Sequence, residues 1–212
     1  MVRFPPGGQQ GHGNVNAGGR AAPSRTRVGR QPGKWCLGTD PVNGSGERER
    51  MNLNSLLHAR ADAGNPVRVG VIGAGKFGSM FLSQALHHPG FHVVGVADLN
   101  PATAEKALLN TGWPKERITR HSAAKALNKG MTFVTDDALS LIEHGGLEVV
   151  VEATGIPEVG IKHALAAFNR GRHVVMVNVE ADVLAGPLLA KKAAEMEVVY
   201  SMAYGDQPSL IC

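Results

Sequence analysis

The chain lacks most of the residues that directly indicate a metal site, a disulfide scaffold or a membrane span. Its 212 residues include two cysteines, Cys36 and Cys212, which show no partner spacing. No apolar run reaches 18 residues, so the sequence predicts no transmembrane helix. Nine histidines are scattered, and a Pro-Gly pair interrupts the one helical pairing, His88 with His92. We therefore expect no metal, no membrane contact and a reducing, cytoplasmic setting.

A basic surface for nucleic acid is also missing from most of the chain. The net charge is +4, but residues 1–50 hold eight Arg or Lys against three acids. Residues 51–212 hold 14 basic and 15 acidic side chains. The basic character thus belongs to the N-terminal stretch, and we expect no nucleic-acid partner for the remainder.

Residues 1–50 contain 11 Gly and 5 Pro, a composition typical of disordered segments. We predict a disordered basic extension there. Three hypotheses explain its origin: a targeting peptide, a basic tail for nucleic acid, or translation that starts at Met51. We favour the third, because the sequence from Met51 reads as an ordinary amphipathic N-terminus, with a lead-in over residues 51–64.

What the chain does contain begins with a glycine turn. The β-branched run Val67–Ile72 predicts a buried parallel strand, and it leads directly into Gly73-Ala74-Gly75-Lys76-Phe77-Gly78. In this G-x-G-x-x-G pattern the first glycine permits the tight turn, the second lets a pyrophosphate approach the backbone, and the third lets the helix pack against the strand. The free N–H groups at the helix start then bind phosphates.

An acid follows at the spacing that a dinucleotide requires. Asp98 ends the next apolar run, 20 residues after Gly78, where it can accept hydrogen bonds from an adenosine ribose. A carboxylate there would repel a 2′-phosphate, which favours NAD over NADP. The basic stretch 112–130 is the one feature that could hold such a phosphate, and we interpret it as a solvated surface excursion.

Strands and helices alternate to residue 203, which predicts a doubly wound parallel α/β sheet, a Rossmann domain over residues 65–203. Six strands are expected: 67–72, 91–98, 131–135, 147–152, 172–182 and 197–204. Ligands of such sheets lie beyond the carboxyl ends of the strands. The predicted cofactor-binding residues are therefore Gly73, Ala74, Gly75, Lys76, Phe77, Gly78, Asp98, Thr154, Gly155 and Asn178.

Four residues near this edge are open to other interpretations. Thr154 and Gly155 would orient the nicotinamide, or form only a strand-to-helix turn. Glu180 is a weaker candidate for the cleft. Glu152, inside a strand, is expected to be paired at an edge or crossing point rather than catalytic. No Ser-His-Asp or paired-carboxylate constellation stands out, so no catalytic residue is assigned.

The segments "VGVIGAGKFGSMF", "VVVEATG", "VVMVNVEAD" and "AYGDQP" resemble the amino-terminal domain of homoserine dehydrogenase-like oxidoreductases. Within that family they are most similar to the deoxyxylulose-phosphate reductoisomerase-like branch. The resemblance covers residues 51–212 and implies NAD(P)(H) bound at the glycine turn, with NADPH in the reductoisomerase-like members. Homoserine dehydrogenases have an Asn-Lys pair after the fifth strand, and its lysine is catalytic. Here Asn178 matches the asparagine but Val179 stands in place of the lysine, which favours the reductoisomerase-like branch.

The resemblance also implies a second domain that binds a small-molecule substrate and forms a homo-oligomer. Residues 204–212 would be its start, so we expect the chain to be a fragment. Two alternatives stay open: a stand-alone dinucleotide-sensing module and an inactive truncated product.

A first prediction follows for the isolated 212-residue chain. It should bind NAD(P)(H) in the micromolar range or more weakly, because the fold supplies cofactor binding, but it should turn over no substrate. Titration followed by nicotinamide fluorescence tests binding, and absorbance at the nicotinamide band tests turnover. Substrate-dependent oxidation of NADPH by this chain alone would contradict the prediction.

Overall fold

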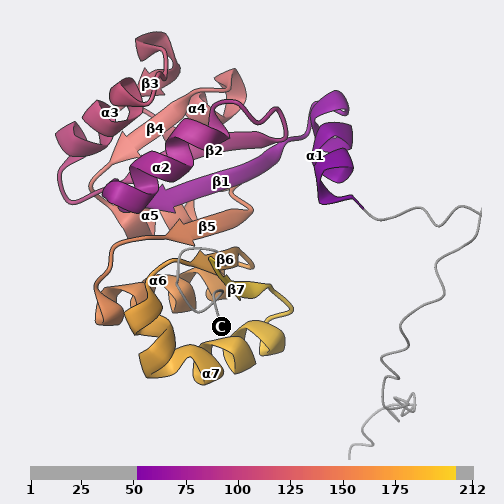
Figure 1. The fold of residues 1–212 in the computed structure, drawn as a ribbon, viewed down its shortest axis with the longest axis vertical. Helices are drawn as coiled ribbons and strands as arrows, with labels where there is room; N and C mark the ends of the chain where they lie inside the picture. The colour runs from indigo at the N-terminus through magenta and orange to yellow at the C-terminus, as the bar shows by residue number, and fades with distance from the viewer. Residues whose placement is uncertain (1–51, 204–212) are drawn as a thin grey trace, which may run out of the picture. The chain divides into compact units, whose positions relative to one another are not determined.

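The computed structural model describes residues 52–203, and the predictions for residues 1–51 and 204–212 lie outside that range. A parallel sheet of seven strands forms the centre, in the order β3-β4-β2-β1-β5-β6-β7 (Figure 1). The strands are β1 (Val67–Ile72), β2 (Phe91–Ala97), β3 (Ile118–Thr119), β4 (Thr132–Thr135), β5 (Val149–Glu152), β6 (His173–Met176) and β7 (Tyr200–Met202). The predicted α/β Rossmann-type domain is confirmed.

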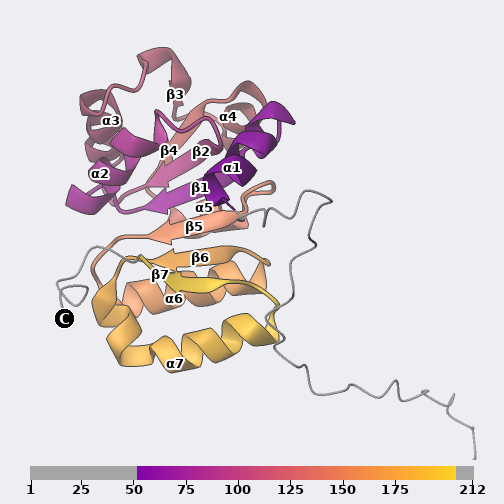
Figure 2. The ribbon, with the colours of Figure 1, turned by 45° about the vertical axis from the view of Figure 1, so that its right-hand side comes forward.

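Helices cover both faces of this sheet, as an all-parallel sheet requires. They are α1 (Leu53–Asp62), α2 (Lys76–Ala85), α3 (Pro101–Asn110), the 3₁₀ turn η1 (Lys115–Arg117), α4 (Ala123–Lys129), α5 (Ala138–Glu143), α6 (Pro157–Asn169) and α7 (Val179–Glu195). Helices α2 and α3 lie over one face, and α5 and α6 over the other, with α7 packed on α6 (Figures 1 and 2).

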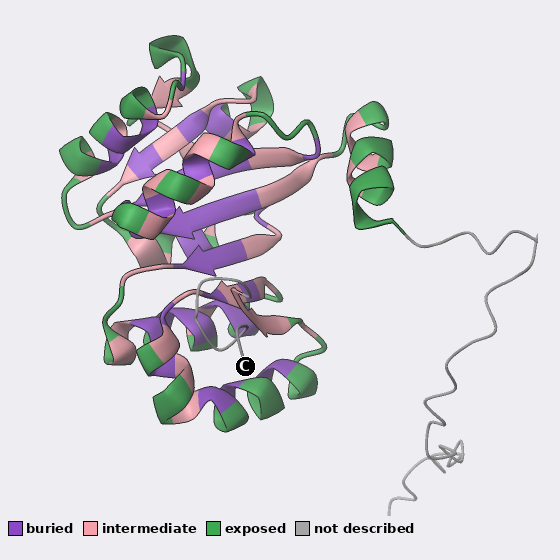
Figure 3. Cartoon of the chain, viewed as in Figure 1, coloured by how far each residue is buried: buried purple, intermediate pink, exposed green. Residues whose placement is uncertain are grey.

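The core consists of two apolar layers, one on each face of the sheet. Leu82, Leu108 and Trp113 fill the layer under α2 and α3, while Phe168 and Leu189 fill the layer under α6 and α7. Figure 3 shows the central strands buried along most of their length and the outer faces of the helices exposed. Within residues 52–203, none of the helices is long and apolar enough to cross a bilayer.

The number of strands differs from the prediction because the basic stretch contributes one. Ile118 and Thr119 pair with Thr132 and Phe133 of β4, which makes β3 the edge of the sheet. A strand of two residues is too short to show the alternation of apolar and polar residues that predicts a strand, so only its pairing with β4 identifies β3. The stretch is therefore more than a surface excursion.

The strand predicted over residues 172–182 is also wrong in its second half. Strand β6 ends at Met176, and Asn178 caps helix α7, its side chain accepting a hydrogen bond from the N–H of Ala181 at 3.2 Å. The cap and the acidic first turn stabilise a helix start there, despite the β-branched valines on either side. The lead-in over residues 51–64 likewise contains a helix, α1.

At the amino end of the sheet, Glu148 ties β1 and β5 to α1. Its carboxylate accepts hydrogen bonds from the Arg60 guanidinium at 2.8 Å and from the Arg68 backbone N–H at 3.0 Å. Burial on its own raises the pKa of Glu148, but the hydrogen bonds and charges of the two arginines outweigh it and hold the pKa below its ordinary value of 4.5.

A pH dependence of stability follows from that depressed pKa. A carboxyl with a lowered folded pKa stabilises the fold above its unfolded pKa, and the effect is lost as the pH falls through the folded value. Glu148→Gln should lower the unfolding free energy by about 1 kcal/mol at pH 7. Thermal unfolding at pH 7 and pH 3 measures this, and the gap in stability between the two proteins should be smaller at pH 3. An equal gap at both pH values would exclude the linkage.

Candidate functional site: a dinucleotide cleft at the carboxyl edge of the sheet

Two glycines of the turn between β1 and α2 are required by the fold itself. Gly73 has a φ of +99°, and a Cβ there would lie 2.5 Å from the carbonyl oxygen of Ala153. A Cβ on Gly78 would lie 2.2 Å from the carbonyl oxygen of Gly73. Both distances are shorter than any real Cβ contact, so a side chain on Gly73 would push the turn away from the end of β5, and one on Gly78 would push α2 away from the turn.

Gly75 is different, because no other described residue occupies the space of its missing side chain. Its φ is −70°, and no heavy atom of the other residues in 52–203, its two chain neighbours aside, lies within 4 Å of a Cβ built there. It is the N-cap of α2 and offers no side-chain hydrogen bond to the helix start. The N–H groups of the first turn of α2 are thus left without a side-chain cap, a geometry that suits a pyrophosphate.

Asp98 follows β2 and is held against the glycine turn. Its Oδ2 accepts a hydrogen bond from the Ala74 N–H at 2.9 Å, and its Oδ1 accepts one from the Asn100 N–H at 3.0 Å. These bonds fix the carboxylate in place. Each oxygen retains acceptor capacity for a ribose hydroxyl.

A cleft of about 490 Å³ lies at this edge of the sheet. Of the predicted residues, Gly73, Gly75, Asp98 and Thr154 line it. Ala74 reaches the site through its backbone bond to Asp98. The structure therefore brings the glycine turn, the acid and the Thr154 hydroxyl around one space.

The other predicted residues do not line the cleft. Lys76 is exposed, Phe77 packs against the core under α2, and Gly155 is an exposed residue with a φ of +70°. Asn178 is 2% exposed, and its amide donates to the Ile156 carbonyl at 2.9 Å as well as capping α7. Glu180 is exposed on the first turn of α7.

Several lining residues were missed by the sequence reasoning. Asp136 and Asp137 follow β4, and Lys162 and His163 come from α6. The two aspartates follow a predicted strand, so the carboxyl-end rule could have found them. Nothing in the sequence indicates that α6 turns Lys162 and His163 toward the cleft.

Glu152 lies on a central strand, between β1 and β6, rather than at an edge of the sheet. It is fully buried, and its Oε1 accepts hydrogen bonds from the Thr154 hydroxyl at 2.5 Å and the Thr154 N–H at 3.3 Å. The Nδ1 of His163 lies 3.4 Å from the same oxygen. Its Oε2 has no hydrogen-bond partner among residues 52–203, a deficit that costs about 1–3 kcal/mol in a buried group.

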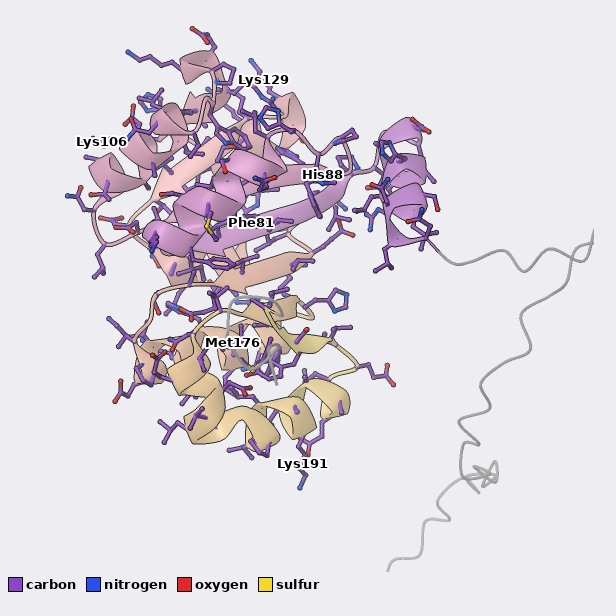
Figure 4. All side chains as sticks on the ribbon, viewed as in Figure 1. Phe81, His88, Lys106, Lys129, Met176 and Lys191 are labelled. Carbon is purple, nitrogen blue, oxygen red and sulfur yellow. The ribbon has the colours of Figure 1, made fainter. Side chains whose placement is uncertain are left out.

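Two arginines of residues 112–130 are engaged by groups outside the cleft. Arg117 donates to the Gly130 carbonyl and lies over the ring of Trp113, and Arg120 pairs with Glu105 at 2.6 Å. Figure 4 shows Lys106, Lys129 and Lys191 extending outward from their helices. Within the described range, no three His, Cys, Asp or Glu side chains converge to hold a metal ion.

A known protein family matches the part of the chain that forms this site. The model of the oxidoreductase family with an NAD-binding Rossmann fold (GFO/IDH/MocA) matches residues 67–176, which run from β1 to the end of β6. The 1-deoxy-D-xylulose 5-phosphate reductoisomerase of Rhodococcus jostii is 29% identical over 143 residues, covering 65% of this chain and 36% of that protein. The predicted reductoisomerase-like branch stays a prediction.

Solved structures show the same fold. Biliverdin reductase from Synechocystis, solved with biliverdin and NADP⁺, superposes with a TM-score of 0.51 at 21% identity, covering 65% of this chain and 38% of that one. A myo-inositol dehydrogenase from Lactobacillus casei, solved with NAD(H) and myo-inositol, gives 0.50 at 19% identity, with coverages of 65% and 36%. The chain spans about a third of the length of these relatives.

Substitutions of Gly75 and Gly78 distinguish an effect on ligand binding from an effect on the stability of the fold. Gly75→Ala should change the unfolding free energy by less than about 1 kcal/mol, since its Cβ meets no atom of the described part of the chain. It should nevertheless weaken ADP binding at least about tenfold by blocking the phosphate approach. Gly78→Ala, the matched control, should destabilise the protein by about 3 kcal/mol or more. Calorimetric titration with ADP and thermal unfolding measure both effects. If Gly75→Ala binds ADP normally, the phosphate does not lie over this turn.

Proposed function

Since the chain belongs to the oxidoreductase family with an NAD-binding Rossmann fold (GFO/IDH/MocA), we propose that it is the cofactor-binding part of a hydride-transfer enzyme. The observation that carries the proposal is the cleft at the carboxyl edge of the sheet. There the open backbone at Gly75, the fixed carboxylate of Asp98 and the hydroxyl of Thr154 meet. A bound nicotinamide would supply or accept the hydride, and this chain's residues would bind and orient it.

Each part of the cleft has a distinct binding role in this proposal. The uncapped N–H groups at the start of α2 hold the pyrophosphate. Asp98, on the β2 side of the turn, accepts hydrogen bonds from the adenosine ribose. The apolar side chain of Leu99, 90% exposed at the rim, offers a surface for the adenine ring. Thr154, on the β5 side, faces the nicotinamide half.

The charge of the adenosine side favours NAD(H) over NADP(H). Asp98, Asp136 and Asp137 all line the cleft, and Lys162 is the lysine among its lining residues. Asp98 cannot swing away from an added 2′-phosphate without giving up its bonds to Ala74 and Asn100. We favour NAD(H) on this basis, although the reductoisomerase-like resemblance implies NADPH.

The substrate is proposed from the resemblance alone. A small hydroxy or carbonyl compound, in the reductoisomerase-like case a phosphorylated one, fits the branch in which Val179 replaces the lysine of homoserine dehydrogenases. The same resemblance supports substrate binding and self-association through a further domain.

Charge removal at Asp98 tests both the site and the choice of cofactor. The wild-type chain should bind NADH at least about tenfold more tightly than NADPH, because a 2′-phosphate close to the carboxylate loses about 1.4 kcal/mol. Asp98→Asn keeps an acceptor for the Ala74 N–H and should bring the two affinities within about threefold. Fluorescence titration with both cofactors gives the ratio.

Asp62→Asn is the matched control, because it removes the same charge from the exposed end of α1. It should leave the ratio unchanged. Tighter binding of NADPH than NADH by the wild type would overturn the cofactor choice, and absence of binding to either would overturn the proposed function.

A further inference from the structure

We propose that Glu152 is a positioning residue for the nicotinamide half of the cofactor and that it acts through the hydroxyl of Thr154. The inference rests on the proposed function, because it assigns a task within the same cleft. Glu152 ends β5, where its neighbours in register are Ile72 on β1 and Met176 on β6, the latter labelled in Figure 4. Its carboxylate is buried behind the cleft wall and does not line the cleft itself.

The hydrogen bonds that Thr154 makes with Glu152 and Ile156 determine whether its hydroxyl can donate to a ligand or accept from it. A hydroxyl has one proton and two acceptor positions. The proton of Thr154 is donated to Glu152 Oε1 at 2.5 Å, and the Ile156 N–H points to one acceptor position at 3.4 Å. One acceptor position remains, and Thr154 lines the cleft. Glu152 therefore makes Thr154 an acceptor toward any bound ligand, and it prevents the hydroxyl from rotating to donate.

The order of the strands determines which half of the dinucleotide meets Thr154. Asp98 follows β2 on one side of β1, and Thr154 follows β5 on the other side. A dinucleotide whose pyrophosphate lies at the turn after β1 extends its adenosine toward β2 and its nicotinamide half toward β5. The nicotinamide half carries donors that fit an acceptor: ribose hydroxyls and the carboxamide NH₂ group.

The environment of Glu152 argues against a role in stability alone. An apolar side chain would fill this buried position without leaving a carboxylate oxygen unpaired. Helix α6 also approaches it very closely at Gly160, where a Cβ would lie 2.9 Å from Glu152 Oε2 and 2.8 Å from Asn178 Nδ2. His163, 6% exposed and part of the cleft wall, contacts the same carboxylate. The carboxylate thus lies behind two groups of the cleft wall.

Titration of the full chain with NADH and with ADP tests the inference, because ADP lacks the nicotinamide half. Thr154→Val and Glu152→Met, which has no acceptor for the Thr154 hydroxyl, should each weaken NADH binding about tenfold, the value of one hydrogen bond, and leave ADP binding within about twofold of wild type. Thr154→Ser retains the hydroxyl and should bind NADH as the wild type does. ADP-ribose, which carries the second ribose without the ring, then shows whether the donor is a ribose hydroxyl or the carboxamide.

The double variant distinguishes positioning from general damage. If Glu152 acts through Thr154, then Glu152→Met added to Thr154→Val should weaken NADH binding no further. An additive loss, or an equal loss for ADP and NADH, would overturn the inference while leaving the proposed function intact. If Glu152→Met does not fold, the Thr154 variants still decide: equal NADH binding by Thr154→Val and Thr154→Ser overturns the inference. Failure of the wild type to bind NADH at all would instead remove the proposed function, and the inference with it.

Discussion

The contact between the end of β1 and the start of α2 is the constraint on which the site depends. With no Cβ on Gly78, the first turns of α2 pack directly onto the Gly73 carbonyl, and the helix start projects over the carboxyl edge of the sheet. The neighbouring strands are in register with this point: the Gly73 N–H donates to the Ala97 carbonyl, and the Ala153 N–H donates to the Ile72 carbonyl, each at 2.8 Å. Asp98 and Thr154 are therefore brought to either side of the turn by backbone pairing alone.

The sequence predicts this part of the fold well because its signals are local. The apolar strand, the three glycines and the acid at the end of the next strand lie within 32 residues and each has a separate physical reason. The second half is less predictable. Valines at 174, 175, 177 and 179 read as one strand, but the side chain of Asn178 caps a helix and divides them. Strand β3 exists only through its pairing with β4, and two residues cannot signal that.

The sequence predicts the site less fully than the glycine turn, because the direction of each side chain depends on contacts that are distant in sequence. The carboxyl-end rule places a backbone at the edge of the sheet, but it does not say where each side chain points. Asp98 and Thr154 turn toward the cleft, whereas the amide of Asn178 turns into the protein and is used there. His163 lies in the second turn of α6, and its approach to Glu152 depends on how α6 packs at Gly160. Such positions follow from tertiary packing, which no local pattern encodes.

The two sides of the cleft each contain a carboxylate, but one faces the cleft and the other is buried behind its wall. On the β2 side, Asp98 is fixed by backbone N–H groups, so its charge faces the cleft and favours a neutral, hydroxyl-rich ligand. On the β5 side, the carboxylate of Glu152 is buried behind the wall, where it contacts the wall residues Thr154 and His163. Between them, the uncapped start of α2 must attract a pyrophosphate despite the nearby acids. Direct N–H contacts and the helix dipole act at hydrogen-bond distance, whereas Asp136 and Asp137 follow β4, two strands away from β1 in the sheet, so the turn is the part of the cleft that best suits a pyrophosphate.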